Sequence, residues 1–406
     1  MNAACTIVSP NYLAYARTLS ASYLKQHPEH RFFVLIVADL PLEDRRIFEG
    51  DGFTPVLLAD LRLEDLRREA MKYDILELNT NVKPTFMKYL IRAFDLENLI
   101  YLDPDIFVYS SLTLVFEQLR RGSTAALTPH LTAPIDDEKL PGEQEMLYNG
   151  TYNLGFIAVR NCEESLRLLN WWERRCLDLG FSEGRTGLFV DQKWMNLVPG
   201  LFDKVAILRH PGCNMAYWNL HERTLAEDAS GYVVNGWARL CFFHFSGVAL
   251  DDPEILSKNT NRFTLAERPD LLKLFGEYKT TVLANKDAAR EGIPYGFDRL
   301  TDGTVVTRLA RRIYAKHQPR WAGEDPFDAR GGFGVFAKKL GLVAGKMPPA
   351  KATWKEFNSK DRRVEIVHRL LKITLRVLGP NRYELLMRYL AHIAVLRNQS
   401  VFLDDK

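Results

Sequence analysis

The chain has 406 residues, of which 47% are hydrophobic and 26% are charged, and its formal net charge is +3. This length predicts two folded units, and this composition excludes a disordered or collagen-like chain. The first residues lack the basic stretch and apolar run of a secretory signal, and no run of about 18 apolar residues occurs. We therefore expect a cytoplasmic protein without a membrane-spanning helix.

The charge is divided unevenly along the chain. Residues 301–406 hold 21 Lys and Arg against 10 Asp and Glu, whereas residues 1–300 hold 33 against 41. A basic tail behind an acidic front suggests that the tail meets an anionic surface.

The cysteines are odd in number and lack the paired spacing of a zinc site. We expect them to be reduced and mostly buried, as is usual in the cytoplasm. They are Cys5, Cys162, Cys176, Cys213 and Cys241.

The first half of the chain alternates apolar runs with stretches of helical spacing. Residues 12–24 and 84–94 are predicted helices. The apolar runs are predicted strands, at 6–8, 31–38, 53–58 and 98–102. This alternation predicts an α/β fold whose mixed, mostly parallel sheet is flanked by helices.

Polar residues follow three of these strands. Ser9, Asp39 and Asp103 each come just after a predicted strand. Since ligands of such sheets bind beyond the carboxyl ends of the strands, we expect a nucleotide at this rim.

The second half continues the pattern and then loosens. Its predicted elements are strands at 152–159, 205–208 and 240–245 and helices at 163–179 and 189–197. The pattern weakens from residue 266, and residues 317–362 resemble a linker or a loosely built cap. Two helices are predicted at the end, at 362–378 and 381–396. We therefore expect a catalytic domain at 1–265 and a linker plus a helical basic C-terminal region at 266–406.

Asp103-Pro104-Asp105 stands directly after the strand at 98–102. Two carboxylates one residue apart can both reach a hard cation such as Mg²⁺ or Mn²⁺, which also binds diphosphate oxygens. The bare pattern is common by chance, and a solvated turn is its alternative interpretation. The apolar strand residues on both sides make it more specific.

Five further blocks accompany this motif in a fixed order. They are Ile7-Val-Ser9-Pro-Asn-Tyr12, Lys83-Pro-Thr-Phe-Met-Lys88, Tyr152-Asn153-Leu-Gly155-Phe, Val190-Asp191-Gln192 and His244-Phe-Ser-Gly247. Together, over residues 3–265, the six blocks resemble the nucleotide-diphospho-sugar transferases of the GT-A (Rossmann-like) fold, most closely the retaining glycosyltransferase family 8 group.

The resemblance implies a role for each block. Ile7, Ser9 and Tyr12 would hold the nucleobase of a UDP-sugar. Asp103, Asp105 and His244 would hold Mn²⁺ or Mg²⁺, although a lone strand histidine is more often a core residue. Gly247 would let the backbone approach the phosphates.

The remaining blocks would surround the sugar. Asn153 and Gln192 offer paired hydrogen bonds to hydroxyls, although either could instead satisfy buried backbone. Asp191 would lie beside the anomeric carbon, with Gln192. Lys88 is expected to face the donor, with Lys83 and Arg92 as competitors for that role.

Two further positions lie outside these six blocks. Trp218 either stacks on an acceptor sugar or belongs to the core. The family's Lys-Pro-Trp after the histidine motif is missing here, and Lys258 is the candidate that reaches back to the diphosphate.

The implied reaction is transfer of a sugar from a UDP-sugar to a glycan or lipid-linked saccharide with retention of configuration. A β-phosphate oxygen would take the acceptor proton, or Asp191 would act as nucleophile in a double displacement. The alternatives are a sugar-nucleotide hydrolase or nucleotidyltransferase and a catalytically inactive carbohydrate-binding protein of this fold. A glycine-rich phosphate loop with its lysine, which would favour a nucleotidyltransferase, does not follow the first strand.

The predicted helix at 362–378 is amphipathic. Its apolar positions are Val364, Val367, Leu371, Leu375 and Leu378, and its basic ones are Arg362, Arg369, Lys372 and Arg376. A helix packed on its own domain is one interpretation, and peripheral contact with an anionic membrane is the other. Nucleic acid binding is not expected, because few aromatic residues accompany the basic ones.

Overall fold

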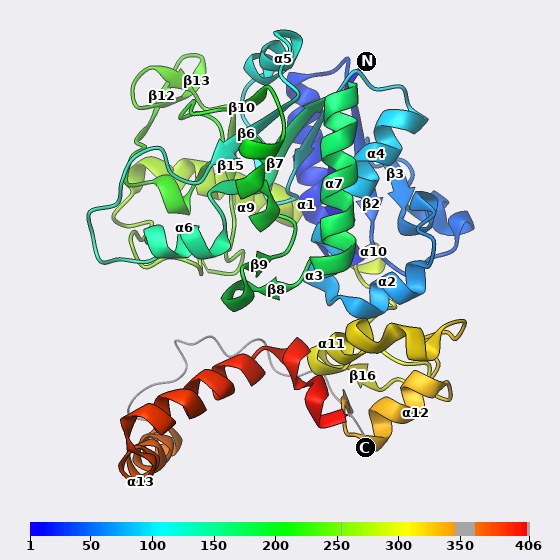
Figure 1. Ribbon diagram of the computed structural model, residues 1–406. Helices are drawn as coiled ribbons and strands as arrows, with labels where there is room; N and C mark the ends of the chain where they lie inside the picture. The colour runs from blue at the N-terminus through cyan, green and yellow to red at the C-terminus, as the bar shows by residue number, and fades with distance from the viewer. Residues whose placement is uncertain (253, 346–361, 404–406) are drawn as a thin grey trace. The chain divides into compact units, whose positions relative to one another are not determined.

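The computed structural model describes residues 1–252, 254–345 and 362–403. The chain divides into two compact units, one made of residues 1–66 and 75–296 and the other of residues 67–74 and 297–406. Figure 1 shows the elements of each unit. The expected end of the catalytic domain at residue 265 falls before α9 (Leu272–Ala284), which packs within the first unit.

A seven-stranded sheet in the order β10-β6-β7-β4-β1-β2-β3 forms the centre of the first unit. Its strands are β1 (Asn2–Val8), β2 (Arg31–Ile36), β3 (Thr54–Leu57), β4 (Asn98–Leu102), β6 (Ala125–Pro129), β7 (Tyr152–Arg160) and β10 (Val205–Ile207). Strand β7 runs antiparallel to β4 and β6, whereas the other neighbouring pairs are parallel. The predicted mixed, mostly parallel sheet is thus confirmed.

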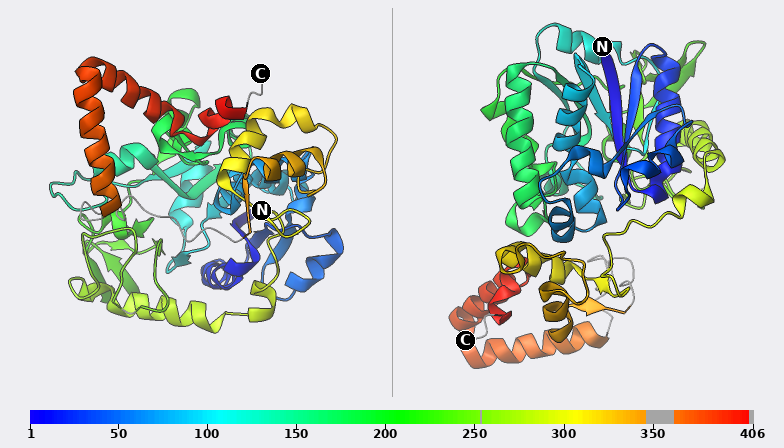
Figure 2. Two further views of the ribbon diagram at one scale, coloured as in Figure 1. Left: turned by 90° about the horizontal axis from the view of Figure 1, so that it is seen from below. Right: turned by 90° about the vertical axis from the view of Figure 1, so that its right-hand side faces the viewer.

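Helices cover both faces of this sheet. The helices α4 (Lys83–Ala93) and α7 (Glu163–Leu179) lie on one face, and α1 (Leu13–Gln26) and α9 lie on the other, as Figure 2 shows edge-on. Coverage from both sides explains why β4 is buried at all five of its positions and carries apolar or aromatic residues at four of them. Leu13, Leu19 and Tyr23 of α1 pack on Val34 and Ile36 in the core.

A second, smaller sheet joins distant parts of the chain. It contains β11 (Met215–Ala216), β15 (Phe242–His244) and β5 (Ile106–Val108) in that order. β5 follows the Asp103-Pro104-Asp105 turn and pairs antiparallel with β15, so that Ile106 lies opposite His244. Strand pairing, and not nearness in sequence, therefore brings the histidine to the acidic motif.

The helix predicted at 189–197 is wrong in its first part. Val190 has a φ of 42°, which no helix accommodates, and Leu188–Phe189 pairs as strand β9 with β8 (Ser182–Glu183). Only Lys193–Leu197 forms a short 3₁₀ helix, η5.

The second unit is mostly helical. It contains α11 (Arg308–His317), α12 (Gly332–Lys339) and the long helix α13 (Arg362–Ile393). Tyr314 and Phe333 pack with Trp321 in its core. The helix α13 consists of two helices joined at Gly379, whose φ of 72° is not helical. The predicted helical C-terminal region is thus confirmed.

Candidate functional site

The structure brings Asp103, Asp105 and His244 together. His244 Nε2 lies 3.0 Å from Asp105 Oδ1 and 3.9 Å from Asp103 Oδ2. One ligand atom of each residue lies within 4.8 Å of those of the other two, so the three donors can meet around one ion. Two carboxylates and an imidazole are a donor set that suits Mn²⁺ or Mg²⁺.

The backbone of the acidic turn is anchored at both ends. Asp103 N donates a hydrogen bond to Gly155 O at 2.8 Å, and Phe245 N donates one to Asp105 O at 2.8 Å. The Tyr101 hydroxyl donates to Asp103 Oδ1 at 2.7 Å. The side chains of Asp103 and Asp105 are 31% and 23% exposed. The carboxylates are therefore fixed in direction and still reachable from solvent.

The orientation of the His244 ring is set by its buried neighbours. His244 Nδ1 lies 3.3 Å from Asn214 Oδ1, while Asn214 Nδ2 donates to Thr128 Oγ1 at 2.8 Å. With Nδ1–H donating to the amide oxygen, Nε2 is left to face the carboxylates. Burial acts to lower the pKa of His244, but Asp105 and Asp103 outweigh it and raise that pKa.

Trp218 is a core residue in this structure. It is 2% exposed, and its ring packs edge-on against His244 at 5.1 Å between centroids. The structure therefore places Trp218 in the core and not on a surface where it could stack on an acceptor sugar. Its ring contacts and supports the His244 ring.

Asp191 forms a buried ion pair with Lys83 of α4. Lys83 Nζ lies 2.6 Å from Asp191 Oδ2 and 4.0 Å from Asp103 Oδ1, and it donates to Leu154 O at 2.8 Å. Burial raises the pKa of Asp191 although the Lys83 charge opposes this. The ammonium is thus the cation that links the Asp191 loop to the acidic turn.

The loop before Asp191 is strained. Val190 is β-branched and still has a φ of 42°, a conformation that costs about 1–3 kcal/mol. Trp172 Nε1 donates to Asp191 O at 3.0 Å and helps to hold the loop. Strain of this kind concentrates at functional sites.

Asn153 and Gln192 are both nearly buried, and both bind protein groups. Asn153 Oδ1 accepts hydrogen bonds from Gly155 N and Asn214 Nδ2, both at 3.1 Å. Gln192 Oε1 accepts from Leu154 N at 3.0 Å, and its Nε2 donates to Asn149 O at 3.1 Å. Asn153 Nδ2 also lies 3.2 Å from His130 Nε2. Each amide thus satisfies neighbouring polar groups, which is the alternative that the sequence left open.

The loop after β1 carries Ser9 and Tyr12, with Ile7 inside the strand. Ile7 is buried, and Ser9 Oγ accepts a hydrogen bond from Asn79 Nδ2 at 2.9 Å. Tyr12 is 46% exposed and stacks on Tyr15 at 5.0 Å. Burial, and after it the Asp105 charge, raises the pKa of Tyr12, so its ring is electrostatically coupled to the acidic turn.

Gly247 and Lys258 lie side by side. Lys258 N donates to Gly247 O at 2.9 Å, and Lys258 is exposed. Gly247 has a φ of 73°, and a Cβ there would lie 2.5 Å from Asn259 Nδ2. This positive φ favours glycine at a position that follows His244 by three residues.

Lys88 points away from this constellation. Its Nζ donates to Asn170 Oδ1 at 2.9 Å and pairs with Glu173, both on α7. Of the basic residues on this helix, the structure brings Lys83 to the acidic turn. Sequence analysis did not identify Asn214 and Thr128 as the residues that support His244. No spacing in the sequence indicates that these three residues meet.

Comparisons with known proteins give remote similarities. No family model matches the chain. The uncharacterized protein YfnF of Bacillus subtilis (strain 168) is 27% identical over 248 residues, covering 61% of this chain and 81% of that protein. YfnD of the same organism is 24% identical over 251 residues, covering 60% and 77%.

Solved glycosyltransferases are among the similar structures. The galactosyltransferase LgtC, in complex with donor and acceptor sugar analogues, has 18% identity and a TM-score of 0.39, over 69% of this chain and 96% of that chain. The glycosyltransferase GlyE of Streptococcus pneumoniae TIGR4 has 15% identity and a TM-score of 0.39, over 77% and 72%.

Proposed function

We propose that this chain is a metal-dependent glycosyltransferase that moves a sugar from a UDP-sugar to a glycan or lipid-linked saccharide, with retention of configuration. The convergence of Asp103, Asp105 and His244 carries this proposal. Two carboxylates that follow a parallel strand and an imidazole from a distant strand meet at the rim where α/β sheets bind nucleotides.

Asp103, Asp105 and His244 would hold the cation, with Asn214 and Trp218 keeping the imidazole in place. When bound, a divalent cation supplies positive charge beside the diphosphate on which negative charge develops as the glycosidic bond breaks. Exposed Lys258, beside Gly247, would add a second positive charge near the phosphates.

The state of Asp191 favours the front-face route of retention over a covalent intermediate. Its carboxylate is 2% exposed and paired with buried Lys83 at 2.6 Å. A carboxylate held in this way is a poor nucleophile, because attack would break its ion pair in a buried environment. In the front-face route, a β-phosphate oxygen accepts the acceptor proton, and Asp191 and Gln192 position the sugar.

A donor panel tests the proposal. We would measure the thermal shift with UDP- and GDP-sugars, with and without Mn²⁺, and then assay the stabilising donor for sugar transfer and for hydrolysis. The proposal expects stabilisation by UDP-sugars that needs Mn²⁺ and depends on Asp105. Hydrolysis without transfer to any saccharide would favour a hydrolase, and binding without either reaction would favour an inactive binding protein.

We also propose that α13 contacts an anionic membrane surface, where a lipid-linked acceptor would lie. Among the described residues no helix is long and apolar enough to cross a membrane. Within α13 several apolar side chains are more than half exposed: Ile366, Val367, Leu370, Ile373 and Val377. Arg369, Lys372 and Arg376 are exposed on the same segment, which is the composition of a helix lying in an interface. The Arg362 side chain lies outside the described residues.

Sedimentation with vesicles tests this contact. Binding to vesicles with anionic lipid should weaken with salt and with Arg369→Glu/Lys372→Glu, and vesicles of zwitterionic lipid alone serve as the control. Binding that ignores both salt and charge reversal would contradict the membrane proposal and leave the transferase proposal untouched.

A further inference from the structure

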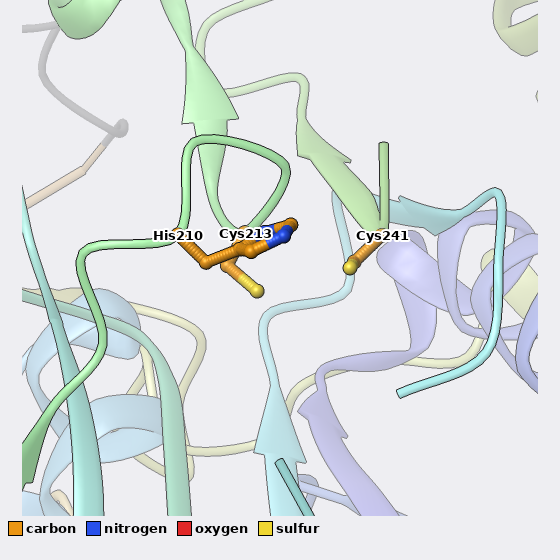
Figure 3. Close-up of side chains that lie close together, drawn as sticks. All are labelled: His210, Cys213 and Cys241. Atoms are coloured by element: carbon orange, nitrogen blue, oxygen red, sulfur yellow. The ribbon is translucent and has the colours of Figure 1, made fainter. Parts of the chain in front are cut away.

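A second cluster of metal-ligating side chains lies apart from the acidic turn. It consists of His210, Cys213 and Cys241, and one ligand atom of each lies within 4.8 Å of those of the other two. Figure 3 shows His210 and Cys213 on one loop and the Cys241 sulfur turned toward them. Both cysteines are 1% exposed, whereas His210 is half-buried and packs on the exposed ring of Trp237.

The backbone locks the two segments of this cluster together. Cys241 N donates to Gly212 O at 2.8 Å, and Cys213 N donates to His210 O at 2.9 Å. A Cβ at Gly212 would lie 1.8 Å from Arg239 O, so only glycine allows this approach. The three side chains are therefore brought together by a rigid frame, as a preformed metal site requires.

The surroundings favour a thiolate at Cys241. Buried Arg223 donates from Nη1 to Cys213 O and to Pro211 O, both at 2.8 Å, which places its positive charge beside the cysteine pair. A hydrogen bond from the Cys213 thiol lowers the pKa of Cys241, with His210 acting in the same direction. The same hydrogen bond, together with burial, raises the pKa of Cys213, so a bound cation would have to displace that proton. Thiolates are the form of cysteine that binds metal.

We propose that His210, Cys213 and Cys241 form a binding site for a soft divalent cation such as Zn²⁺, distinct from the hard-cation site at Asp103. Two thiolates, one neutral imidazole and a divalent ion sum to zero charge, which limits the cost of burial. Three protein ligands leave the fourth tetrahedral position for water. Sulfur ligands select Zn²⁺ over the Mg²⁺ or Mn²⁺ that carboxylates prefer.

A cation bound at this site would also help to hold His244 in position beside the acidic turn. Cys213 is followed by Asn214 and β11, and Cys241 is followed by β15 with His244 at its end. These strands pair in parallel, so an ion bound by both cysteines would tie together the two segments that hold the His244 ring.

Cadmium titration of the reduced full-length chain tests the proposal. We expect one Cd²⁺ per chain to give a thiolate-to-cadmium absorption band that Zn²⁺ abolishes and excess Mg²⁺ does not. Cys213→Ser/Cys241→Ser should lose the band, His210→Ala should weaken binding at least tenfold, and the half-buried Cys162→Ser should leave the band unchanged. His210→Ala keeps the test valid if the double variant does not fold.

Two results would overturn the proposal. One is a band that persists in His210→Ala and in the double cysteine variant with unchanged affinity. The other is a count of three free thiols in the unfolded, unreduced protein in place of the five in the structure, since a Cys213–Cys241 disulfide cannot bind the ion.

Discussion

The His244 ring occupies the space that a side chain at Gly155 would fill. A Cβ on residue 155 would lie 2.3 Å from His244 Cε1 and 2.7 Å from His244 Nδ1. Gly155 O also accepts the hydrogen bond from Asp103 N at 2.8 Å. One glycine therefore sets both the place of the imidazole and the start of the acidic turn.

Gly155→Ala should weaken Mn²⁺ binding without removing a ligand. Because the ring must move, we expect about a 10–100-fold loss of affinity, the size seen when support around a metal ligand is lost. Calorimetric titration with Mn²⁺ measures it. Gly200→Ala is the control, since no atom lies within 4 Å of a Cβ there. Unchanged Mn²⁺ affinity in Gly155→Ala would show that His244 is not a ligand.

Removal of a carboxylate should abolish transfer. Asp103→Ala and Asp105→Ala are expected to lower the transfer rate by about 10²-fold or more, because charge on the leaving diphosphate then lacks its counterion. EDTA should do the same to the unmodified protein. The exposed acid Glu43 provides a matched control as Glu43→Ala. Full turnover by Asp105→Ala in metal-free buffer would refute the metal mechanism.

The Lys83–Asp191 pair should matter for stability as well as for the site. Lys83→Met leaves Asp191 as a buried charge without its partner at 2.6 Å, which costs about 3–5 kcal/mol. Lys83→Met/Asp191→Leu should recover much of this loss. Denaturant unfolding monitors it, with Lys88→Met as control, because the Lys88 pair on α7 is more exposed. Equal losses of unfolding free energy in Lys83→Met and Lys88→Met would contradict the claim that the buried Lys83–Asp191 pair matters more for stability than the Lys88–Glu173 pair.

Acid should destabilise the fold through two buried histidines. Burial lowers the pKa of His130 and that of His27 from the usual 6.5 to about 4. Between those values the unfolded chain binds more protons than the folded one, so the unfolding free energy falls as pH falls from 6.5 toward 4. Chemical unfolding at several pH values should show this slope, reduced in His130→Gln. If the unfolding free energy of His130→Gln depended on pH as steeply as that of the unmodified protein, His130 would not contribute to the loss of stability in acid.

Local signals predicted the central sheet and the position of Asp103 directly after one of its strands. The strand predicted at 98–102 and the helix predicted at 163–179 match β4 and α7 residue for residue. The strand is a continuous run that is buried on both faces, and the helix has a regular apolar stripe that is buried on one face. The pairing of strands that are far apart in the sequence could not be predicted from local patterns. The sequence does not show that β5 pairs with β15, and family resemblance alone linked His244 to Asp105.

Side-chain direction was equally hidden. Lys83 and Lys88 lie on the same helix, and only the packing of α4 against α7 decides that Lys88 meets Glu173 while Lys83 meets Asp191. Cys213 and Cys241 lack a recognisable spacing for the same reason, since loop and strand bring them together. The expectation that both are buried is confirmed.

Titration of free Mn²⁺ by electron paramagnetic resonance in the presence of UDP tests the central claim most directly. We predict that the unmodified chain removes one Mn²⁺ per chain from solution and that Asp105→Ala and His244→Ala each lose this binding, while Glu43→Ala keeps it. Equal Mn²⁺ uptake by all four proteins would show that the acidic turn and the histidine do not hold a common ion.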